Sequence, residues 1–456
     1  MRNNNQWKIF LGASLVISVA LAGANLISSA KDPHQRFDGT REYVGQQNVV
    51  VPQALYNSVW NIIQDEYYDP TKYGQDWGRW QHRYDGKLKT LDDAHKAIET
   101  ALASLGDRYT RFLDKEAFSD EKESIEARLY GVGIQIGSDK AQRIIVIAPL
   151  EDTPASRAGV LSGDQIAEID GKSTSGFSVE EAAKAIKGEK GSFVELTLMR
   201  KDERVKVKMM RDEIHISSIP AGSAKMLDHD IGYIRLSSFI SRTADEEVKK
   251  ALTNLSSAKG IILDLRDNPG GLLSNAIEIS NMFLDGHKNI VFTVDADGYK
   301  TPAVTDGKPV TNQPLVVLIN KGSASASEIA SGALKDNGRA VLIGQRTFGK
   351  GLVQGIRKLE DKSGFNYTIA KYLTPNDTDI NKIGISPDVQ VELSSEDYEK
   401  GRGPWWIDVD GSNSSRKPED LSDYQLKKGF EYLKSHLENK LVVGKISTET
   451  PLVRGN

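Results

Sequence analysis

The feature that most constrains the fold of this chain is a run of small residues, 322–328 (Gly-Ser-Ala-Ser-Ala-Ser-Glu), between an expected strand and an expected helix. Residues 313–319 form a short apolar, β-branched run that predicts a buried strand, and residues 329–334 predict a close-packed helix. A serine at such a junction lies at a helix N-terminus, where free N–H groups and the helix dipole favour developing negative charge. The pattern is typical of a nucleophile, although taken alone it also fits a helix cap with tight packing.

A glycine-rich bend downstream carries the candidate general base. Lys350 lies between Gly349 and Gly351, and Gln354 follows in a second strand-like run. A lysine acts as a general base only when its amine is neutral, which requires burial or neighbouring cations to lower its pKa. A serine–lysine pair is one of the known variants of the serine-protease triad. The two segments together therefore predict serine hydrolase chemistry.

These segments resemble the C-terminal processing (tail-specific) peptidases, a serine–lysine protease family that carries a PDZ domain. The resemblance covers roughly residues 52–395, and its motifs include residues 322–329, 344–354, 372–375 and 384–388. It implies that Ser325 is the nucleophile, Lys350 the general base and Gln354 the residue that orients the lysine. It implies no cofactor and no metal.

A second turn is expected to lie beside the nucleophile. The strand at residues 261–266 leads into Asn268-Pro269-Gly270-Gly271, which taken alone is a tight turn. Alternating strands and helices predict a largely parallel sheet, whose sites lie at the carboxyl ends of the strands. In the family the corresponding turn supplies an oxyanion-hole N–H, which the resemblance assigns to Gly271, with Gly270 as the alternative. Ala326, directly after the nucleophile, would supply the second N–H.

Two further features, one in the strand before this turn and one in the C-terminal tail, allow more than one interpretation. Asp264 and Arg266 fit acid chemistry, but we expect them to pin the turn that shapes the oxyanion hole. The pair Trp405-Trp406 is expected to pack on the core, with substrate contact as the alternative.

Residues 126–213 resemble a PDZ domain. There, a glycine-containing loop turns N–H groups toward the terminal carboxylate of a peptide, and the peptide adds to the sheet as a β-strand. The resemblance assigns this loop to four consecutive residues, Tyr130, Gly131, Val132 and Gly133. Lys187, at the end of an expected helix, stands where relatives often carry arginine, and lysine lacks the planar fork of that side chain.

The region before the PDZ domain is expected to be helical. Apolar residues recur at helical spacing from Pro52 to a stop at Asp69-Pro70, and again from Leu91 to a stop at Gly106. The segment 105–113 that follows is either a helix stop with a packed turn or a family motif. Relatives usually have proline where this chain has Arg108, and we expect that change to affect the turn rather than the chemistry.

The expected fold is multidomain α/β. It comprises an N-terminal helical domain (31–125), a β-rich PDZ domain with two helices (126–213), a crotonase/ClpP-like α/β protease core (214–392) and a charged helical C-terminal tail (393–456).

The N-terminus is typical of an export signal. Arg2 and Lys8 precede an uncharged stretch, residues 9–30, that ends in small residues. We expect residues 1–30 to be a cleaved signal peptide or a retained anchor, since about 20 apolar residues span a bilayer. The expected location is the cell envelope, in the periplasm and attached to the inner membrane if residues 9–30 are retained; a thylakoid lumen is the alternative.

Composition argues against several other classes. The chain has no cysteines, which excludes disulfides, a cysteine nucleophile and thiolate metal sites. Its seven histidines are scattered, so neither a zinc site nor a Ser-His-Asp triad is expected. A net charge of −4 gives no indication of nucleic-acid binding, and no phosphate or dinucleotide loop is present.

The sequence therefore predicts an exported serine endopeptidase that recognises apolar, unstructured protein C-termini through its PDZ domain and cleaves near them. Two rivals are a PDZ scaffold that binds tails with little or partner-dependent proteolysis, and a non-proteolytic crotonase-like enzyme, against which the intact Ser325, Lys350 and Gln354 set argues. The prediction leaves room for an adaptor lipoprotein, for a homo-oligomer and for a resting form opened by substrate on the PDZ domain.

Overall fold

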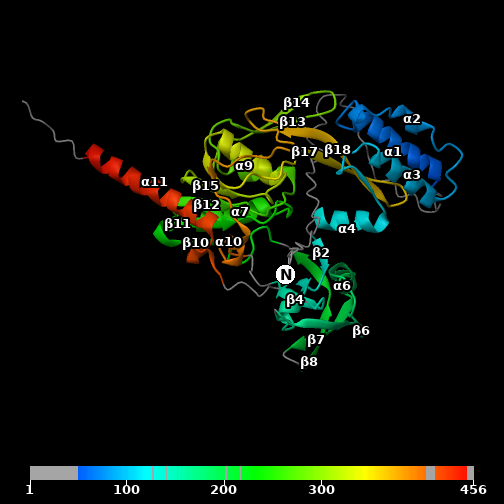
Figure 1. The fold of residues 1–456 in the computed structure, drawn as a ribbon, viewed down its shortest axis with the longest axis horizontal. Coiled ribbons are helices and arrows are strands. Elements are labelled where there is room, and N and C mark those ends of the chain that lie inside the picture. Colours follow the sequence, from blue (N-terminus) through cyan, green and yellow to red (C-terminus); the bar gives the residue numbers. More distant parts are fainter. Residues whose placement is uncertain are drawn as a thin grey trace, which may run out of the picture.

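The computed structural model describes residues 50–448 except 126–127, 140, 151–152, 162, 201–202, 216 and 407–415. The expected leader, residues 1–30, and the link that follows it lie outside the described residues. Figure 1 shows a helical unit, a strand-rich unit and a larger α/β core, which confirms the predicted fold class. Within the described residues, no helix has the length and apolar character that a membrane crossing requires.

The N-terminal helical unit is built on two amphipathic helices, α1 (Pro52–Glu66) and α3 (Leu91–Ala103), with the short helix α2 (Gly78–Gln81) beside them. Thr90 begins α3 with a capping box, since its hydroxyl accepts the N–H of Asp93 and the Asp93 carboxylate accepts the N–H of Thr90. The apolar faces of α1 and α3 pack together with aromatic side chains of β18.

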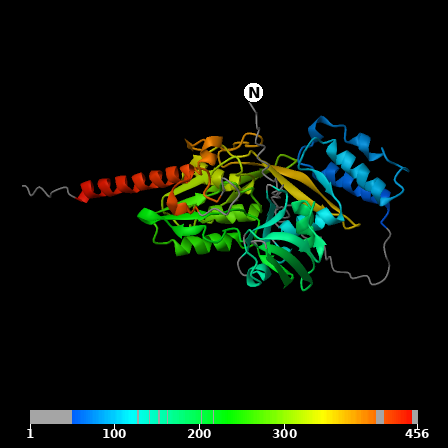
Figure 2. The ribbon, with the colours of Figure 1, turned by 60° about the horizontal axis from the view of Figure 1, so that its bottom comes forward.

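An antiparallel sheet connects this unit to the core. Its strands are β1 (Arg111–Leu113), β13 (Asn289–Val294), β14 (Lys300–Val304), β17 (Leu352–Lys358) and β18 (Gly364–Leu373). Figure 2 shows the long β17–β18 hairpin reaching from the core to the helical unit. Because β18 pairs with β1 as well as with β17, the hairpin carrying Gln354 is fixed to the chain that leaves α3.

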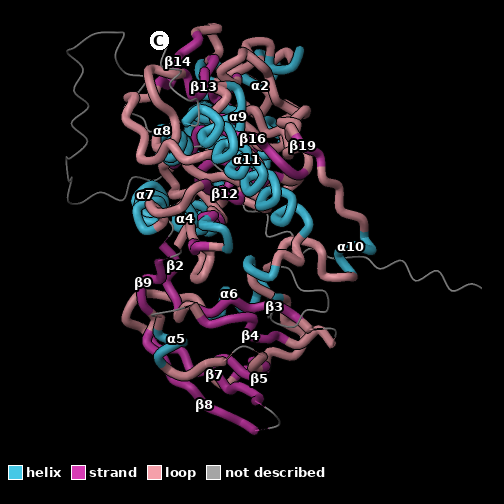
Figure 3. The backbone as a smooth tube through the Cα atoms, turned by 90° about the vertical axis from the view of Figure 1, so that its left-hand side faces the viewer, coloured by secondary structure: helices cyan, strands magenta, loops and turns pink. Residues whose placement is uncertain are grey.

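The strand-rich unit has its own hydrophobic core, and Figure 3 shows the unit below the α/β core, with α5 (Pro154–Arg157) and α6 (Val179–Ile186) among its strands. Its sheet contains β3 (Ile134–Ser138), β4 (Ile144–Pro149), β5 (Gln165–Ile169), β6 (Lys172–Ser173), β7 (Phe193–Arg200) and β8 (Glu203–Met210). The helices α5 and α6 pack on it. The helix α4 (Lys115–Ile125) and the two-stranded ribbon of β2 (Arg128–Gly131) and β9 (Asp212–His215) lie on the side facing the rest of the molecule.

The α/β core contains a six-stranded sheet that is parallel except at one edge. Its order is β10 (Ala224–Met226), β11 (Ile231–Arg235), β12 (Gly260–Asp264), β15 (Leu315–Ile319), β16 (Ala340–Gly344) and β19 (Val389–Gln390), with β10 antiparallel. One face is covered by α7 (Ala244–Asn254), α8 (Leu273–Asn281) and α9 (Ala326–Asp336). Side chains alternate between faces, so the central strands are apolar on both sides, as a buried parallel sheet requires.

The C-terminal region covers the other face of this sheet. Leu426, Phe430 and Leu433 of α11 (Tyr424–Thr448) pack against residues of β11, β12 and β15, and the outer part of α11 extends away from the core in Figure 1. The short helix α10 (Ser395–Glu399) precedes it. Residues 418–420 form a 3-10 turn and Leu421 takes a left-handed backbone conformation with φ of 49°, so α11 begins only after them, at Tyr424.

Candidate active site

Ser325 lies at the carboxyl end of the parallel sheet, immediately before α9. Its side chain is fully buried, and its backbone has φ of 55° and ψ of −115°, a strained conformation for a residue other than glycine. Within the described part of the chain, no partner forms a hydrogen bond with its hydroxyl. A buried, unpartnered hydroxyl on a strained turn at a helix N-terminus is available to react with a group that enters the site.

Lys350 lies in the loop before β17 and is only 3% exposed. Burial lowers the pKa of its amine from 10.5 to about 8, because a charged ammonium is disfavoured where water is excluded. Its Nζ atom stands 4.8 Å from the centroid of the Tyr109 ring. The amine is therefore neutral in a substantial fraction of molecules near pH 8, as a general base requires.

The Glu328 carboxylate connects the Ser325 and Lys350 segments. Its Oε2 accepts the N–H of Ser325 at 2.9 Å and the N–H of Lys350 at 2.8 Å. Its Oε1 accepts the N–H of Gly349 at 2.7 Å and the hydroxyl of Thr347 at 2.5 Å. Burial raises the pKa of Glu328, and these four donors act in the opposite direction. The carboxylate thereby fixes the two backbone segments against each other.

Tyr372 of β18 provides a second connection between the same segments. Its hydroxyl donates to the carbonyl of Lys350 and lies 3.2 Å from the carbonyl of Ser325. Burial raises the pKa of Tyr372 well above its usual range, so the hydroxyl remains a donor. The fold therefore holds Ser325 and Lys350 through their carbonyls as well as through their N–H groups.

Gln354 is buried on β17, and the structure gives its amide one hydrogen bond. Its Nε2 donates to the Thr368 hydroxyl at 3.3 Å, and that hydroxyl donates to Asp107 at 2.6 Å. The amide oxygen has no partner among the residues that the structure describes. Its nitrogen is thus tied to the helical unit, while its acceptor is available to a nearby donor such as an amine.

The Asn268–Gly271 turn follows β12 and lies beside Ser325, as the parallel-sheet argument predicted. A Cβ on Gly270 would come within 2.9 Å of Ser325 Cβ and of Ala326 N. The N–H of Gly270 already donates to Asn268 Oδ1 at 2.9 Å. In the described structure, no acceptor takes a hydrogen bond from the N–H of Gly271 or of Ala326. This difference favours Gly271 over Gly270 as a donor to an incoming oxygen.

Arg266 and Asp264 form a buried ion-pair network behind this turn. Arg266 is 0% exposed and forms charge-assisted hydrogen bonds with Asp264 at 2.6 Å and with Asp423, just before α11, at 2.8 Å. The guanidinium also lies 5.0 Å from the ring of Trp406, and Trp405 donates to the Tyr233 hydroxyl. The prediction that the tryptophan pair packs on the core is confirmed.

The predicted tail-binding loop joins β2 to β3. Gly133 has φ of 75°, and a Cβ there would come within 2.4 Å of Thr153 side-chain atoms. The carbonyls of Val132 and Gly133 are occupied by N–H donors at 2.9 Å. The N–H groups of the same two residues meet no acceptor in the part of the chain that is described. The loop therefore presents donors, which is the arrangement that a carboxylate needs.

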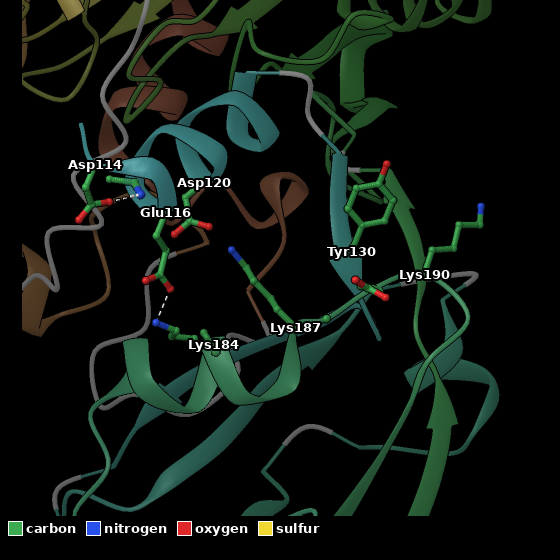
Figure 4. A pocket seen from close by; sticks show the side chains of 11 residues that line it. Asp114, Glu116, Asp120, Tyr130, Lys184, Lys187 and Lys190 are labelled. Atoms are coloured by element: carbon green, nitrogen blue, oxygen red, sulfur yellow. Dashed lines mark hydrogen bonds and ion pairs between the residues drawn. The ribbon is translucent and has the colours of Figure 1, made fainter. Parts of the chain in front are cut away.

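One of the four predicted tail-binding residues, Tyr130, lines a cavity of about 1010 Å³ between α4 and the strand-rich unit. Figure 4 shows Tyr130 on β2 at one side of it and Lys187 pointing from the end of α6 into it, toward α4. Glu116 of α4 forms an ion pair with Lys184 across the opening. The structure thus brings Tyr130 and Lys187 to one cavity, away from Ser325, with acidic side chains on the α4 side.

Four residues near Ser325 and Lys350 were not singled out for a role by the sequence: Asp107, Tyr109, Glu328 and Tyr372. One local signal was present, since Ser-x-x-Glu is the pattern of a capping box. The other three reach the site through β1–β18 and β17–β18 pairing, which sequence periodicity does not specify. Across the described residues, no group of three His, Asp or Glu side chains could hold a metal ion.

Comparison with known proteins gives a consistent result. Residues 230–391 match the model of peptidase family S41, and residues 119–199 match the PDZ domain. The chain is 43% identical over 345 residues to a carboxyl-terminal-processing protease of Picosynechococcus sp., covering 74% of this chain and 83% of that protein. It is 38% identical over 325 residues to a carboxy-terminal processing protease of Bacillus subtilis, covering 70% and 68%. A solved structure of a photosystem II D1 C-terminal processing protease aligns with a TM-score of 0.51 and 33% identity, covering 75% of this chain and 94% of that one.

Proposed function

Because the chain belongs to the carboxyl-terminal-processing proteases of peptidase family S41, serine-type peptidases that carry a PDZ domain, we propose that it cuts with a Ser325–Lys350 dyad near the C-termini of exported proteins. The single observation that carries this proposal is that a buried serine hydroxyl without a hydrogen-bond partner among the described residues and a buried lysine whose pKa is lowered to about 8 lie on backbone segments that one carboxylate joins. Glu328 and Tyr372 hold the two segments together.

The proposed reaction begins when Ser325 Oγ attacks the scissile carbonyl and the neutral Lys350 amine takes its proton. The N–H groups of Gly271 and Ala326 then donate to the oxyanion of the tetrahedral intermediate. The C–N bond breaks, and the Lys350 ammonium returns its proton to the leaving amine. Water attacks the acyl-enzyme with its proton passing to Lys350, the ester bond to Ser325 breaks, and the Lys350 ammonium returns the proton to Ser325 Oγ.

We assign Gln354 to orientation of the base. Its amide oxygen can accept a hydrogen bond from the Lys350 amine, since no described residue occupies it. Its nitrogen is held by Thr368, which in turn is held by Asp107. This connection fixes the direction in which the amide presents its acceptor.

Substrate recognition is assigned to the strand-rich unit. Unoccupied N–H groups of Val132 and Gly133 can receive a terminal carboxylate, and the peptide would add as a strand to the adjacent sheet. A Cβ added at Gly131 would lie 4.0 Å from the Cα of Lys187, and Tyr130 lines the same cavity as Lys187. The proposed substrates are proteins with unstructured, apolar C-termini.

Export is proposed from residues 1–30, with the cell envelope as the destination. Relatives include proteins named as chloroplastic from Arabidopsis thaliana and Tetradesmus obliquus, which keeps a thylakoid lumen as the alternative. Retention of residues 9–30 as an anchor, delivery by an adaptor lipoprotein and homo-oligomer formation remain parts of the proposal to be measured.

The test is cleavage of an unfolded reporter protein with an apolar C-terminal tail by the purified full chain, beside Ser325→Ala and Lys350→Ala. We expect the parent to cut, and each variant to lose about 10⁴-fold or more of kcat while still binding the tail. Cleavage that survives both substitutions would overturn the assignment. If the parent and both variants bind the tail and none of them cleaves the reporter, the result would favour the alternative, a PDZ scaffold that binds tails with little proteolysis.

A further inference from the structure

The turn between α3 and β1 places an aromatic ring and a second cation beside Lys350. The Tyr109 ring centroid is 4.8 Å from Lys350 Nζ and also 4.8 Å from the guanidinium carbon of Arg108. The same guanidinium lies 5.2 Å from the centroid of Phe348, two residues before the lysine. Arg108 therefore lies across the junction between the helical unit and the loop that carries Lys350.

The position of this turn is fixed independently of Lys350. Both oxygens of the buried Asp107 carboxylate are used, Oδ1 by the N–H of Tyr109 at 3.0 Å and Oδ2 by the hydroxyls of Thr110 at 2.8 Å and Thr368 at 2.6 Å. Arg108 donates to the Tyr109 hydroxyl at 2.6 Å, and Phe348 donates its N–H to the carbonyl of Ser323 at 3.0 Å. The stack of Arg108, Tyr109 and Phe348 is thus attached at one end to the helical unit and at the other to the Ser325 loop.

We propose that Arg108 is a positioning residue for Lys350, holding Tyr109 against the amine and keeping a fixed positive charge beside it. The inference rests on the proposed serine–lysine chemistry. The proposal differs from the expectation that Arg108, where relatives usually have proline, would affect the turn rather than the chemistry. The expectation came from local sequence, whereas the contacts to Phe348 and Lys350 arise only in the folded chain.

The charges around the amine give Arg108 a specific role. Four charged side chains act on Lys350 through space, three carboxylates and one guanidinium: Glu121 of α4, Asp107, Glu328 of α9 and Arg108. The carboxylates favour the ammonium form, while a neighbouring cation favours the neutral amine. Both cationic groups lie over one ring and so are within about 10 Å of each other, roughly a Debye length at 0.1 M salt. The Tyr109 and Tyr372 hydroxyls are the titratable groups that complete the surroundings.

The experiment compares kcat/KM between pH 6 and pH 10 for the full chain and its Arg108→Gln variant, with the same tailed reporter. Loss of the positive charge should move the midpoint of the rise upward by about 0.5 to 1 pH unit, which lowers activity about 3- to 10-fold at neutral pH and leaves the high-pH plateau almost unchanged. Arg108→Lys retains the charge and should keep the midpoint closer to that of the parent. The difference should shrink in about 1 M salt, because Arg108 is exposed.

Arg83→Gln is the matched control, since Arg83 stacks on two rings of the same unit, Trp80 at 4.8 Å and Tyr84 at 5.9 Å. Its profile should equal that of the parent. An Arg108→Gln midpoint equal to the parent's, or an activity loss of the same size at every pH, would overturn the proposal by showing a structural effect only. Failure of the serine–lysine assignment is distinguished separately, because Lys350→Ala would then keep its activity.

Discussion

Oε2 of Glu328 accepts the backbone N–H of Lys350 at 2.8 Å while also accepting the N–H of Ser325. One buried oxygen therefore sets the spacing between the backbone of the proposed nucleophile and that of the proposed base. Burying a charged carboxylate costs free energy, and the four hydrogen bonds that Glu328 accepts offset this cost.

Replacing this carboxylate should uncouple the two segments. In Glu328→Gln the amide nitrogen has to face the N–H groups of Ser325 and Lys350 in one orientation, or the N–H of Gly349 beside the Thr347 hydroxyl in the other, so at least one hydrogen bond to a backbone N–H is lost either way. We expect a loss of about 10²-fold in kcat, the effect of a displacement of roughly 1 Å, with the PDZ unit still binding the tail. Single-turnover cleavage and tail binding by fluorescence anisotropy measure the two quantities.

Glu392→Gln serves as the control for this change. Glu392 lies at the surface of the α/β core, and its carboxylate accepts hydrogen bonds from the side-chain amides of Gln345 and Gln390. It should retain activity within about twofold, since surface substitutions have small effects. Equal activity of the Glu328 and Glu392 variants would show that the carboxylate has no positioning role.

The activity of the parent should depend on pH through Lys350. Its pKa is lowered to about 8, so the amine is protonated and inactive below that pH and neutral above it. We expect kcat/KM to rise about tenfold per pH unit up to about pH 7.5 and to level off above pH 8.5. Circular dichroism at each pH checks that the chain stays folded. A flat profile between pH 6 and pH 9 would argue against Lys350 as the base.

The Gly270 position should not tolerate a side chain. Its φ is +103°, and a Cβ would stand 2.7 Å from the carbonyl of Ala324 and 2.9 Å from Ser325 Cβ. Gly270→Ala should therefore displace the neighbouring N–H of Gly271 and lower kcat by about 10²- to 10³-fold, the effect of losing one oxyanion-hole donor. Initial rates at saturating substrate measure it.

Gly298→Ala is the control that separates the steric clash of an added Cβ from the strain of a positive φ. Gly298 also has a positive φ, +81°, but nothing lies within 4 Å of an added Cβ. It should lose about 1 to 2 kcal/mol of stability, the cost of a positive φ for a residue with a Cβ, and keep its kcat. A Gly270→Ala variant that keeps its kcat as well would remove the turn from the proposed mechanism.

The sequence predicted the order of the elements around Ser325 because each signal there is local. An apolar run, a small-residue junction and an Asn-Pro-Gly-Gly turn after the neighbouring strand place both segments at one edge of a parallel sheet. Lys350 was found in the same way, from the glycines around it. Its lowered pKa follows from burial, which only the assembled fold establishes.

The side chains that hold Ser325, Lys350 and Gln354 in place could not be predicted in the same way. Tyr372 and Thr368 reach the site because β18 pairs with β17 in a register that includes a bulge near Gln354. A shift of one residue would turn each of these side chains to the opposite face. Asp107 depends on the further pairing of β18 with β1. Cross-strand register depends on the pairing of all the strands in the sheet, so it cannot be predicted from one segment.

The C-terminal region should be part of the stability of the core, through Asp423. Arg266 is fully buried between Asp264 and Asp423, and α11 covers one face of the sheet with Leu426, Phe430 and Leu433. Asp423→Asn leaves Arg266 with one carboxylate in place of two. Breaking a buried pair costs about 3–5 kcal/mol, because the remaining charge stays out of water without its partner. The measurement is urea unfolding of the full chain, followed by tryptophan fluorescence because Trp406 stacks on Arg266.

Asp420→Asn is the matched control, because Asp420 is exposed and, among the described residues, its carboxylate accepts a hydrogen bond from the local backbone N–H of Lys417. The free energy of unfolding of this variant should lie within about 0.5 kcal/mol of that of the parent. A free energy of unfolding of Asp423→Asn equal to that of Asp420→Asn would mean that Asp264 alone is sufficient as the partner of Arg266. In that case the C-terminal region would stabilise the core through the apolar contacts of Leu426, Phe430 and Leu433, and the Asp423 ion pair would add nothing.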